Sequence, residues 1–324
     1  RRRSRHDPAG GGCRVRHLLG IRGLTPEEAL GILDEAPRYQ DVANQPVPRV
    51  PILMGRTVTH LFMEPSTRTQ ASFQLAAKRL SAEPLAFVPK FSSLSKGETF
   101  LDTARTLASM APDIVVVRSR ESGASHVLAR EIPTAQIVNA GDGISEHPTQ
   151  ALLDAFTIRE RLGRIAGVRV TIIGDLLHSR VFRSNARLLT MLGAEVRCCG
   201  PPTLVPPGLD RLGVRSLLHI AEALEGAEAV MVLRIQHERM HASYIPTERE
   251  YYREFGVTSE RLALTDSAIV LHPGPLNRGV EISSEVADGP QSVILDQVRN
   301  GVAVRMAVLA EIARSSPRSH KTDG

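Results

Sequence analysis

Residues 58–80 read VTHLFMEPSTRTQASFQLAAKRL, and this stretch decides the fold. Its first six residues are mostly apolar and predict a buried strand that stops before Pro65. Apolar side chains then recur from Phe73 at i, i+3, i+4 and i+7, a spacing that predicts a helix with one buried face. A buried strand followed directly by an amphipathic helix is typical of α/β proteins.

Four polar residues, Ser66, Thr67, Arg68 and Thr69, lie where this helix is expected to begin. The first turn of a helix carries unpaired N–H groups and the positive end of the helix dipole. Three hydroxyls and a guanidinium at that position can surround a phosphate with hydrogen-bond donors. The same residues also suit an ordinary Ser/Thr N-cap beside a surface Arg. Residue chemistry alone leaves both interpretations open.

Strand-like and helical patterns alternate along the rest of the chain, which predicts parallel sheets. The expected strands are 57–63, 114–117, 136–139, 168–174, 195–199, 229–233 and 269–272. The expected helices are 25–36, 71–81, 99–110, 150–162, 185–192, 258–264 and 302–312. We therefore predict an α/β protein of two similar domains, each a parallel sheet flanked by helices, joined by inter-domain helices.

The chain of 324 residues is long enough for two domains of ordinary size. We expect a first domain over 17–150, a second over 151–314 whose terminal helix packs back on the first, and a flexible tail over 315–324. Residues 1–16 contain six Arg and one Asp, which accounts for the entire formal net charge of +5. We expect this Gly-rich segment to be a disordered basic tail. The remainder is charge-balanced, so it gives no case for nucleic-acid binding.

Composition excludes several further classes of protein. No apolar run approaches the roughly 20 residues that a membrane span needs, and the N-terminus lacks the apolar core of a secretory signal. The cysteines, Cys13, Cys198 and Cys199, have neither metal-ligand spacing nor a disulfide pattern, which favours a reduced cytoplasmic setting. Neither a Walker A motif nor the glycine motif of NAD binding occurs. We therefore expect no cofactor and no metal.

Several charged side chains lie where ligands bind in α/β proteins. Arg118 ends one predicted strand, and the carboxyl ends of strands in open parallel sheets carry the ligand sites. Arg180 and Arg234 follow two further strands and suit a dicarboxylate, because each guanidinium can form a bidentate pair. All three also suit an ordinary surface. By residue type alone, His147 after a Gly-rich turn is more often structural, and Lys96 in a polar loop more often solvated, than catalytic.

Four segments, in this order along the chain, resemble the signatures of the aspartate/ornithine transcarbamoylase family. They are FMEPSTRT (62–69) with ASF after it, the loop SSLSKGET (92–99), HPTQ (147–150) and HPGP (272–275). The resemblance covers about residues 17–314. It implies a first domain that binds carbamoyl phosphate and a second domain that binds the amino acid.

The resemblance also implies which residues form the site. For carbamoyl phosphate they are Ser66, Thr67, Arg68, Thr69, Ser92, Lys96, Arg118, His147, Gln150, Gly274 and Pro275. For aspartate they are Lys96, Arg180, Arg234 and Gln236. The residues implied in catalysis are Arg68, Thr69, Lys96, Arg118 and His147. In the family a Ser and a Lys of the second segment reach the active site of a neighbouring subunit, so Ser92 and Lys96 imply a homotrimer with shared active sites.

Two positions favour aspartate over ornithine as the acceptor. Thr149 and Pro273 stand where ornithine enzymes of the family usually carry Cys. The implied reaction is transfer of the carbamoyl group of carbamoyl phosphate to the α-amino group of L-aspartate, in de novo pyrimidine biosynthesis. Two alternatives stay open: a transcarbamoylase for another amine such as ornithine, and a catalytically weak homologue that acts as a scaffold or binding subunit. A regulatory chain or a dihydroorotase partner is neither indicated nor excluded, whereas nucleic-acid and membrane partners are not expected.

Three places depart from the family pattern. Gln70 stands where an Arg is usual, and we expect this change to affect the anchoring of the helix more than the chemistry. Residues 87–91 replace a run that is normally rich in Asn, Ser and Gly, and we expect them to stiffen the loop that follows. Phe182 stands where Ala is common, and we expect it to crowd the aspartate side of the site. The first two departures are the support for the scaffold alternative.

Overall fold

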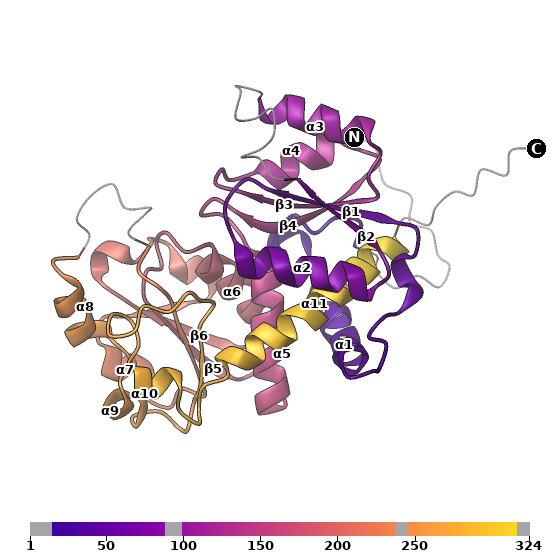
Figure 1. The fold of residues 1–324 in the computed structure, drawn as a ribbon. Coiled ribbons are helices and arrows are strands. Elements are labelled where there is room, and N and C mark those ends of the chain that lie inside the picture. Colours follow the sequence, from indigo (N-terminus) through magenta and orange to yellow (C-terminus); the bar gives the residue numbers. More distant parts are fainter. Residues whose placement is uncertain (1–14, 88–98, 237–244, 316–324) are drawn as a thin grey trace, which may run out of the picture.

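The protein is represented by a computed structural model that describes residues 15–87, 99–236 and 245–315. These residues form two parallel sheets flanked by helices (Figure 1). The first sheet has the order β2-β1-β3-β4 and contains β1 (Thr57–Phe62), β2 (Glu83–Phe87), β3 (Ile114–Ser119) and β4 (Gln136–Asp142). The second has the order β7-β6-β5-β8-β9 and contains β5 (Arg169–Ile173), β6 (Glu195–Cys199), β7 (Arg215–Leu217), β8 (Ala229–Val232) and β9 (Ile269–Leu271). The predicted α/β class with two similar halves is confirmed.

Helices cover both faces of each sheet. Their bounds are α1 (Pro26–Ala43), α2 (Thr67–Arg79), α3 (Phe100–Ser109), α4 (Ala124–Glu131), α5 (Pro148–Leu162), α6 (Arg180–Met191), α7 (Ile220–Leu224), α8 (Glu248–Phe255), α9 (Ser259–Leu262), α10 (Ser284–Ala287) and α11 (Ile294–Arg314). On the first sheet, α3 and α4 lie on one face and α2 with α11 on the other (Figure 1). On the second sheet, α5 and α6 cover one face, and α7, α9 and α10 the other.

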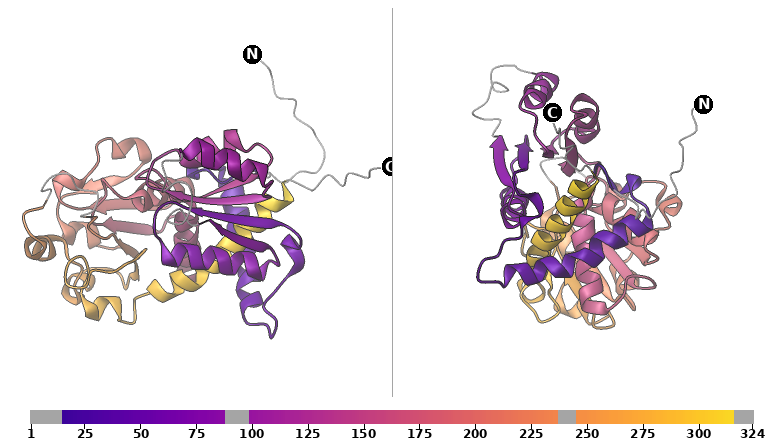
Figure 2. Two further views of the ribbon diagram at one scale, coloured as in Figure 1. Left: turned by 45° about the horizontal axis from the view of Figure 1, so that its top comes forward. Right: turned by 90° about the vertical axis from the view of Figure 1, so that its right-hand side faces the viewer.

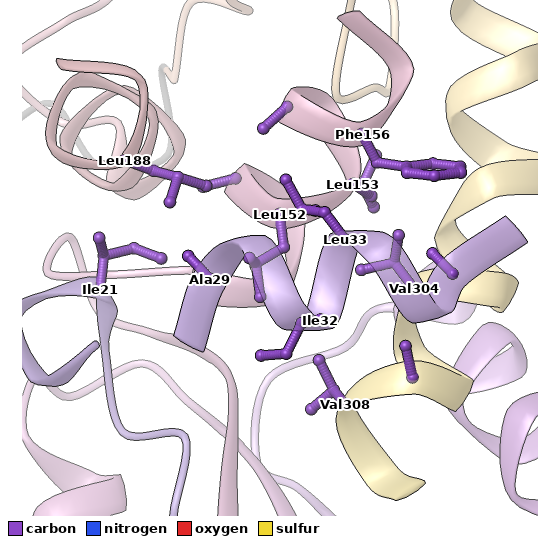
Figure 3. Close-up of a cluster of buried hydrophobic side chains, with 14 of the residues drawn as sticks. Ile21, Ala29, Ile32, Leu33, Leu152, Leu153, Phe156, Leu188, Val304 and Val308 are labelled. Atoms are coloured by element: carbon purple, nitrogen blue, oxygen red, sulfur yellow. The ribbon is translucent and has the colours of Figure 1, made fainter. Parts of the chain in front are cut away.

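Two helices connect the halves. α5 leads from β4 to β5, and α11 returns from the second half to pack beside α1 and α2 (Figures 1 and 2). Apolar side chains of α1, α5 and α11 meet in one buried cluster, with Leu33, Leu153 and Val304 among them (Figure 3). Each such side chain contributes roughly 1.5–3 kcal/mol on burial. The expected division between residues 150 and 151 therefore falls inside a helix that belongs to this shared core.

The helices α1 and α11 extend at least seven residues beyond the predicted ranges because tertiary contacts override local signals. Proline inside a helix removes a hydrogen bond and costs about 3 kcal/mol, yet α1 continues through Pro37 to Ala43. Tyr39 and Val42 follow the proline and are buried, and their burial offsets the cost of continuing the helix. α11 begins at Ile294 rather than at residue 302, and it contains Gly301 because a Cβ there would meet the Arg305 guanidinium at 2.6 Å.

Several elements had no clear signal in the sequence. The strands β2 and β7 lie at the sheet edges and are largely exposed, so they lack the apolar runs that predict buried strands. The helices α4, α7, α8 and α10 are short, and each buries one to three side chains. Residues 1–14, 88–91 and 316–324, for which we expected tails or a stiffened loop, lie outside the described residues. In the part of the chain that the structure describes, no helix has the length and apolar character to cross a membrane.

Candidate active site

A cavity of about 500 Å³ lies between the two halves, and residues of both halves line it. The predicted site residues among its lining are Ser66, Thr67, Arg68, Thr69, Arg118, His147, Gln150, Arg180, Arg234, Gln236, Gly274 and Pro275. Two further predicted residues, Ser92 and Lys96, lie outside the described residues. Every predicted site residue that the structure describes is therefore brought to one cavity, although these residues span more than 200 positions of the sequence.

The N-terminus of α2 opens into this cavity. Ser66 is the N-cap residue and Thr67 begins the helix, as the motif predicted. The Ser66 side chain makes no capping hydrogen bond, so capping does not consume its hydroxyl. Thr69 is buried against the cavity wall. The first turn thus presents backbone N–H groups and hydroxyls to the cavity, an arrangement that suits an anion.

Arg68 lies against the loop that follows β9. A Cβ on Gly274 would meet the Arg68 Nη1 atom at 2.3 Å, and Gly274 has a φ of +64°, so only glycine suits this position. Partial burial, with the nearby charge of Arg234, lowers the pKa of the Arg68 guanidinium. Arg68 of the first half and Arg234 of the second half are therefore electrostatic neighbours, and a bound anion would relieve their repulsion.

Glu64 pairs with two of the predicted arginines, and the sequence patterns did not single it out. Arg180 donates to both of its carboxylate oxygens, at 2.9 and 3.1 Å, and Arg118 Nη2 lies 3.5 Å from Oε1. The bidentate pair with Arg180 joins the first half to the second across the cavity. The signal that could have found Glu64 is its position, an acidic residue directly after a buried strand and inside the 62–69 motif.

Arg118 and Arg180 both pack on Gly141. A Cβ at this glycine would lie 3.1 Å from Arg118 Nη1 and 3.1 Å from Arg180 Cζ. Arg118 Nη1 donates to the Ala140 carbonyl at 3.1 Å, and Arg180 Nη1 donates to the Gly143 carbonyl at 3.2 Å. The turn after β4 thus holds both guanidinium planes. Arg180 was expected after a strand end, but it begins α6, where Ser179 caps the helix.

His147 is the N-cap residue of α5, and its backbone N–H donates to Ser184 Oγ at 2.8 Å. Its side chain is only slightly exposed, and Nδ1 has no hydrogen-bond partner among the described residues. Burial, together with the charges of Arg118, Arg180 and Arg305, holds the pKa of His147 well below its ordinary value. The imidazole is therefore neutral at physiological pH and can act as a hydrogen-bond donor without carrying charge.

The predicted amino-acid side of the cavity is built at the ends of β5 and β8. Gln236, just after β8, donates its backbone N–H to Asp175 Oδ2 at 3.3 Å. Asp175 also accepts from the backbone N–H of His178 at 3.1 Å and lies 3.0 Å from its Nδ1. These contacts tie the two strand ends together, and Arg234 lines the same cavity as Arg68, where its charge adds to the burial that lowers the pKa of Arg68.

The loop after β9 is held by a chain of buried hydrogen bonds. The backbone N–H of Gly274 donates to His272 Nδ1 at 2.8 Å, so the proton of this imidazole lies on Nε2. His272 Nε2 is 3.1 Å from Glu281 Oε1, and both side chains are fully buried. The Gly274–Pro275 peptide is cis. The hydrogen bonds of His272 with Gly274 and Glu281 hold the backbone of this loop, which lines the cavity, in one conformation.

The expectations about Phe182, Gln70 and Thr149 have different outcomes. Phe182 does not crowd the cavity: it is fully buried in the core, where the amphipathic pattern of α6 places it, and Val181 lines the cavity instead. Gln70 is half-buried on α2 and does not line the cavity. Thr149 is fully buried and does not line the cavity either. Among the described residues, no cluster of three or more His, Cys, Asp or Glu side chains has the geometry of a metal site.

Comparisons with known proteins agree with this arrangement. The family model described as "Aspartate/ornithine carbamoyltransferase, carbamoyl-P binding domain" matches residues 16–160, and the "Asp/Orn binding domain" model matches residues 166–312. The aspartate carbamoyltransferase catalytic subunit of Sorangium cellulosum is 56% identical over 295 residues, covering 91% of this chain and 92% of the relative. The corresponding subunit of Bradyrhizobium diazoefficiens is 52% identical over 305 residues, covering 94% and 96%.

Solved structures show the same relationship. The aspartate transcarbamoylase of Trypanosoma cruzi, in complex with N-(phosphonacetyl)-L-aspartic acid, has a TM-score of 0.82 at 29% identity and covers 92% of this chain and 95% of that one. The ornithine carbamoyltransferase of Pyrococcus furiosus has a TM-score of 0.84 at 28% identity, covering 93% and 98%. The chain belongs to the aspartate/ornithine carbamoyltransferase family.

Proposed function

We propose that this protein transfers the carbamoyl group of carbamoyl phosphate to the α-amino group of L-aspartate, giving N-carbamoyl-L-aspartate and phosphate. The observation that carries the proposal is the convergence of the α2 N-terminus, the four predicted arginines and a neutral His147 on one cavity of about 500 Å³. Relatives that are 49–56% identical and bear the name aspartate carbamoyltransferase catalytic subunit support this acceptor. The reaction belongs to de novo pyrimidine biosynthesis, and we propose that it takes place in the cytoplasm.

In this proposal the first domain, 17–150, binds carbamoyl phosphate. Ser66, Thr67 and Arg68 hold the phosphate, which is also the leaving group. Thr69, Arg118 and His147 donate to the carbonyl oxygen and stabilise the oxyanion that develops when the amine attacks. Such donors are worth about 3–4 kcal/mol each when they are preorganised. A neutral His147 suits this role, because it donates a hydrogen bond without releasing a proton.

The second domain, 151–314, binds L-aspartate. Arg180 would hold the α-carboxylate and Arg234 the β-carboxylate, with Gln236 assisting, since each guanidinium offers a bidentate fork.

Gln150 and the backbone carbonyls at Gly274 and Pro275 would accept hydrogen bonds from the carbamoyl NH₂. No side chain needs to act as a nucleophile. The rate acceleration would come from orienting the two substrates relative to each other, and closure of the two halves would exclude water from the cavity.

Two arguments favour aspartate over ornithine: the charge of the cavity, and the residues at positions 149 and 273, where ornithine enzymes usually carry Cys. The charge is the stronger argument. The cavity presents Arg68 and Arg234 as neighbours, so the ammonium group of ornithine would face a concentration of positive charge. Pro273 lines the cavity and supports the same assignment. Thr149 gives no structural support for aspartate as the acceptor, because it does not line the cavity.

We further propose a homotrimer with shared active sites. Among the residues that the structure describes, no lysine lines the cavity, and a phosphate-binding Lys96 from a neighbouring subunit would supply that charge. Ser92 would accompany it. Size-exclusion chromatography with light scattering tests the trimer, and co-purification would reveal a regulatory chain or a dihydroorotase if either binds.

The test of the function is an assay of the purified chain with carbamoyl phosphate and L-aspartate, with L-ornithine in parallel. We expect carbamoyl-aspartate to form and carbamoyl-ornithine (citrulline) not to form. An Arg68→Ala variant is the control for the phosphate site. Turnover with ornithine alone would overturn the acceptor. A folded protein without turnover of either amine would favour the scaffold alternative instead.

A further inference from the structure

Asp154 lies at the middle of α5 with its side chain fully buried, and three side-chain amides from three helices converge on it. Gln150 Nε2 of α5 donates to Oδ1 at 2.9 Å, and Gln297 Nε2 of α11 donates to the same oxygen at 2.7 Å. Asn185 Nδ2 of α6 donates to Oδ2 at 2.8 Å. An ionised carboxylate can only accept hydrogen bonds, so each amide must turn its nitrogen toward Asp154.

Because each amide nitrogen faces Asp154, the position of each amide oxygen is decided as well. The oxygen and nitrogen of a Gln amide lie in one plane and on opposite sides of the Cγ–Cδ bond, so fixing the nitrogen also fixes the oxygen. Gln150 lines the cavity, and with Nε2 bound to Asp154 it offers the cavity its Oε1 atom, an acceptor. The NH₂ of a carbamoyl group is a donor, whereas an acyl methyl group is not.

The second amide reaches the loop after β9. Gln297 Oε1 accepts the backbone N–H of His272 at 2.8 Å, while its Nε2 is held by Asp154. His272 in turn accepts from the backbone N–H of Gly274 and lies against Glu281. The conformation of residues 272–275 therefore depends on an amide whose orientation Asp154 sets. The proposed acceptors for the carbamoyl NH₂ are Gln150 Oε1 and the backbone carbonyls of this loop. The positions of both depend on the carboxylate of Asp154.

We propose that Asp154 is a positioning residue that makes the site selective for the NH₂ of a carbamoyl group over the methyl of an acyl phosphate. This inference rests on the proposed function, because it concerns the same donor substrate. Arg305 of α11 is the charged group whose field favours the ionised form of Asp154 against the cost of burial. Asp154 itself does not line the cavity, so it acts through Gln150 and Gln297.

The test compares three ligands in an Asp154→Asn variant. Acetyl phosphate carries a methyl in place of the carbamoyl NH₂, and inorganic phosphate carries neither group. We expect kcat/KM for carbamoyl phosphate to fall at least about ten-fold, the size of a lost buried hydrogen bond. The inhibition constants of acetyl phosphate and inorganic phosphate should stay within about two-fold, because the phosphate motif at the α2 N-terminus is oriented by its own helix. Loss of all three affinities by one factor would mean a structural role only and would overturn the proposal.

Two further variants keep the test decisive. Glu160→Gln is the matched control, because Asn300 of α11 donates to Glu160 at 2.7 Å, which is the same type of contact between α5 and α11 away from the cavity. It should leave all three constants unchanged. If Asp154→Asn does not fold, Gln297→Met removes the link to His272 and should show the same selective loss. A Gln297→Met variant with unchanged constants would then sink the proposal.

The outcomes separate this inference from the function on which it rests. A wild-type chain without turnover of carbamoyl phosphate and L-aspartate would refute the proposed function. An active wild-type chain whose Asp154→Asn variant shows wild-type constants for all three ligands would refute only the role of Asp154.

Discussion

The two ends of the cavity are built in different ways. The end proposed to bind phosphate is local: Ser66, Thr67, Arg68 and Thr69 are consecutive, and the first turn of α2 orients them. The end proposed to bind the carbamoyl group, the carbamoyl end, is assembled from α5, α6, α11 and the loop after β9, with a buried carboxylate behind it. The N–H groups of a helix N-terminus are donors for an anion without any further partner. A side-chain amide can present either its oxygen or its nitrogen, so it serves as an acceptor only where a partner binds the nitrogen.

The phosphate end should be broken most severely by Arg68→Ala. We expect kcat/KM for carbamoyl phosphate to fall about 10³-fold, because loss of a charge-assisted donor to the leaving group costs about 3–4 kcal/mol. The inhibition constant of inorganic phosphate should rise in parallel. Lys78→Ala at the exposed far end of the same helix is the control and should leave the kinetics unchanged. Equal effects of both variants would contradict a local phosphate site.

The contact between the two ends is tested by Gly274→Ala. A Cβ there would meet Arg68 Nη1 at 2.3 Å, so the guanidinium must move, and we expect kcat/KM to fall about 100-fold. Gly279→Ala is the matched control, since Gly279 also has positive φ, +77°, but among the described residues a Cβ there would meet no atom within 4 Å beyond its chain neighbours. It shares the backbone strain and lacks the collision. Similar activity of the two variants would show that strain, not the contact with Arg68, matters.

The pair between the halves is tested by Glu64→Gln. Arg180 and Arg118 would lose the carboxylate that orients them, and we expect kcat to fall about ten-fold, in line with the loss of charge-assisted hydrogen bonds. The inhibition constant of inorganic phosphate should change little, because the first turn of α2, rather than Glu64, orients the phosphate motif. Steady-state kinetics with Glu83→Gln on the exposed edge strand as control would check this expectation. A large rise in the phosphate constant would show that the two ends are not separable.

The smallest expected effect is a pH dependence confined to the carbamoyl end. Burial raises the pKa of Asp154 from its ordinary value to about 6, while hydrogen bonds from Asn185, Gln297 and Gln150 and the charge of Arg305 oppose the rise. Below about pH 6 the carboxyl is protonated, can donate, and no longer forces the amide orientations. The ratio of wild-type kcat/KM to that of Asp154→Asn should therefore shrink several-fold between pH 8 and pH 5. A ratio that is the same at both pH values would argue against this titration.

The same shift has a consequence for stability, with a definite sign. The folded protein holds the Asp154 proton to a higher pH than the unfolded chain does, so its contribution to the unfolding free energy is full below about pH 4 and is lost as pH rises through about 6. Asp154→Asn should therefore be less stable relative to wild type at pH 5 than at pH 8. His147 acts oppositely, because its lowered pKa costs stability only as pH falls below about 6.5. Urea unfolding of both proteins at the two pH values measures the difference, and a constant offset would contradict the assignment.

Contiguous motifs were the most predictable part of the site. Residues 66–69 were expected to stand at the start of a helix, and α2 begins at Thr67, whereas phosphate binding by these residues stays a prediction. A helix was expected from residue 150, and α5 begins two residues earlier, at Pro148. Strand ends predicted Arg118 and Arg234, because parallel strands bring their carboxyl ends to one edge. These signals are readable since each depends on neighbours within a few residues.

Contacts between distant segments were not predictable in the same way. Glu64 lies in the 62–69 motif, but its pairing with Arg180 depends on how the two halves meet. Asp154 and Gln297 are separated by 143 positions, and nothing local marks a buried Asp on a helix as a partner for amides. Phe182 was expected near the substrate because it follows Arg180 in sequence, whereas successive helical residues point in different directions.

The sequence by itself determined the α/β class, the helix that begins at the phosphate motif and the chemistry of the residues available to the site. These depend on periodicity and on groups close together along the chain. Only the tertiary structure decided that Arg68 lies against Gly274, that Glu64 joins Arg180 and that Asp154 orients Gln150 and Gln297. The physical reason is that hydrogen-bond polarity and ion pairing in a buried site depend on atoms that packing alone brings within about 3 Å.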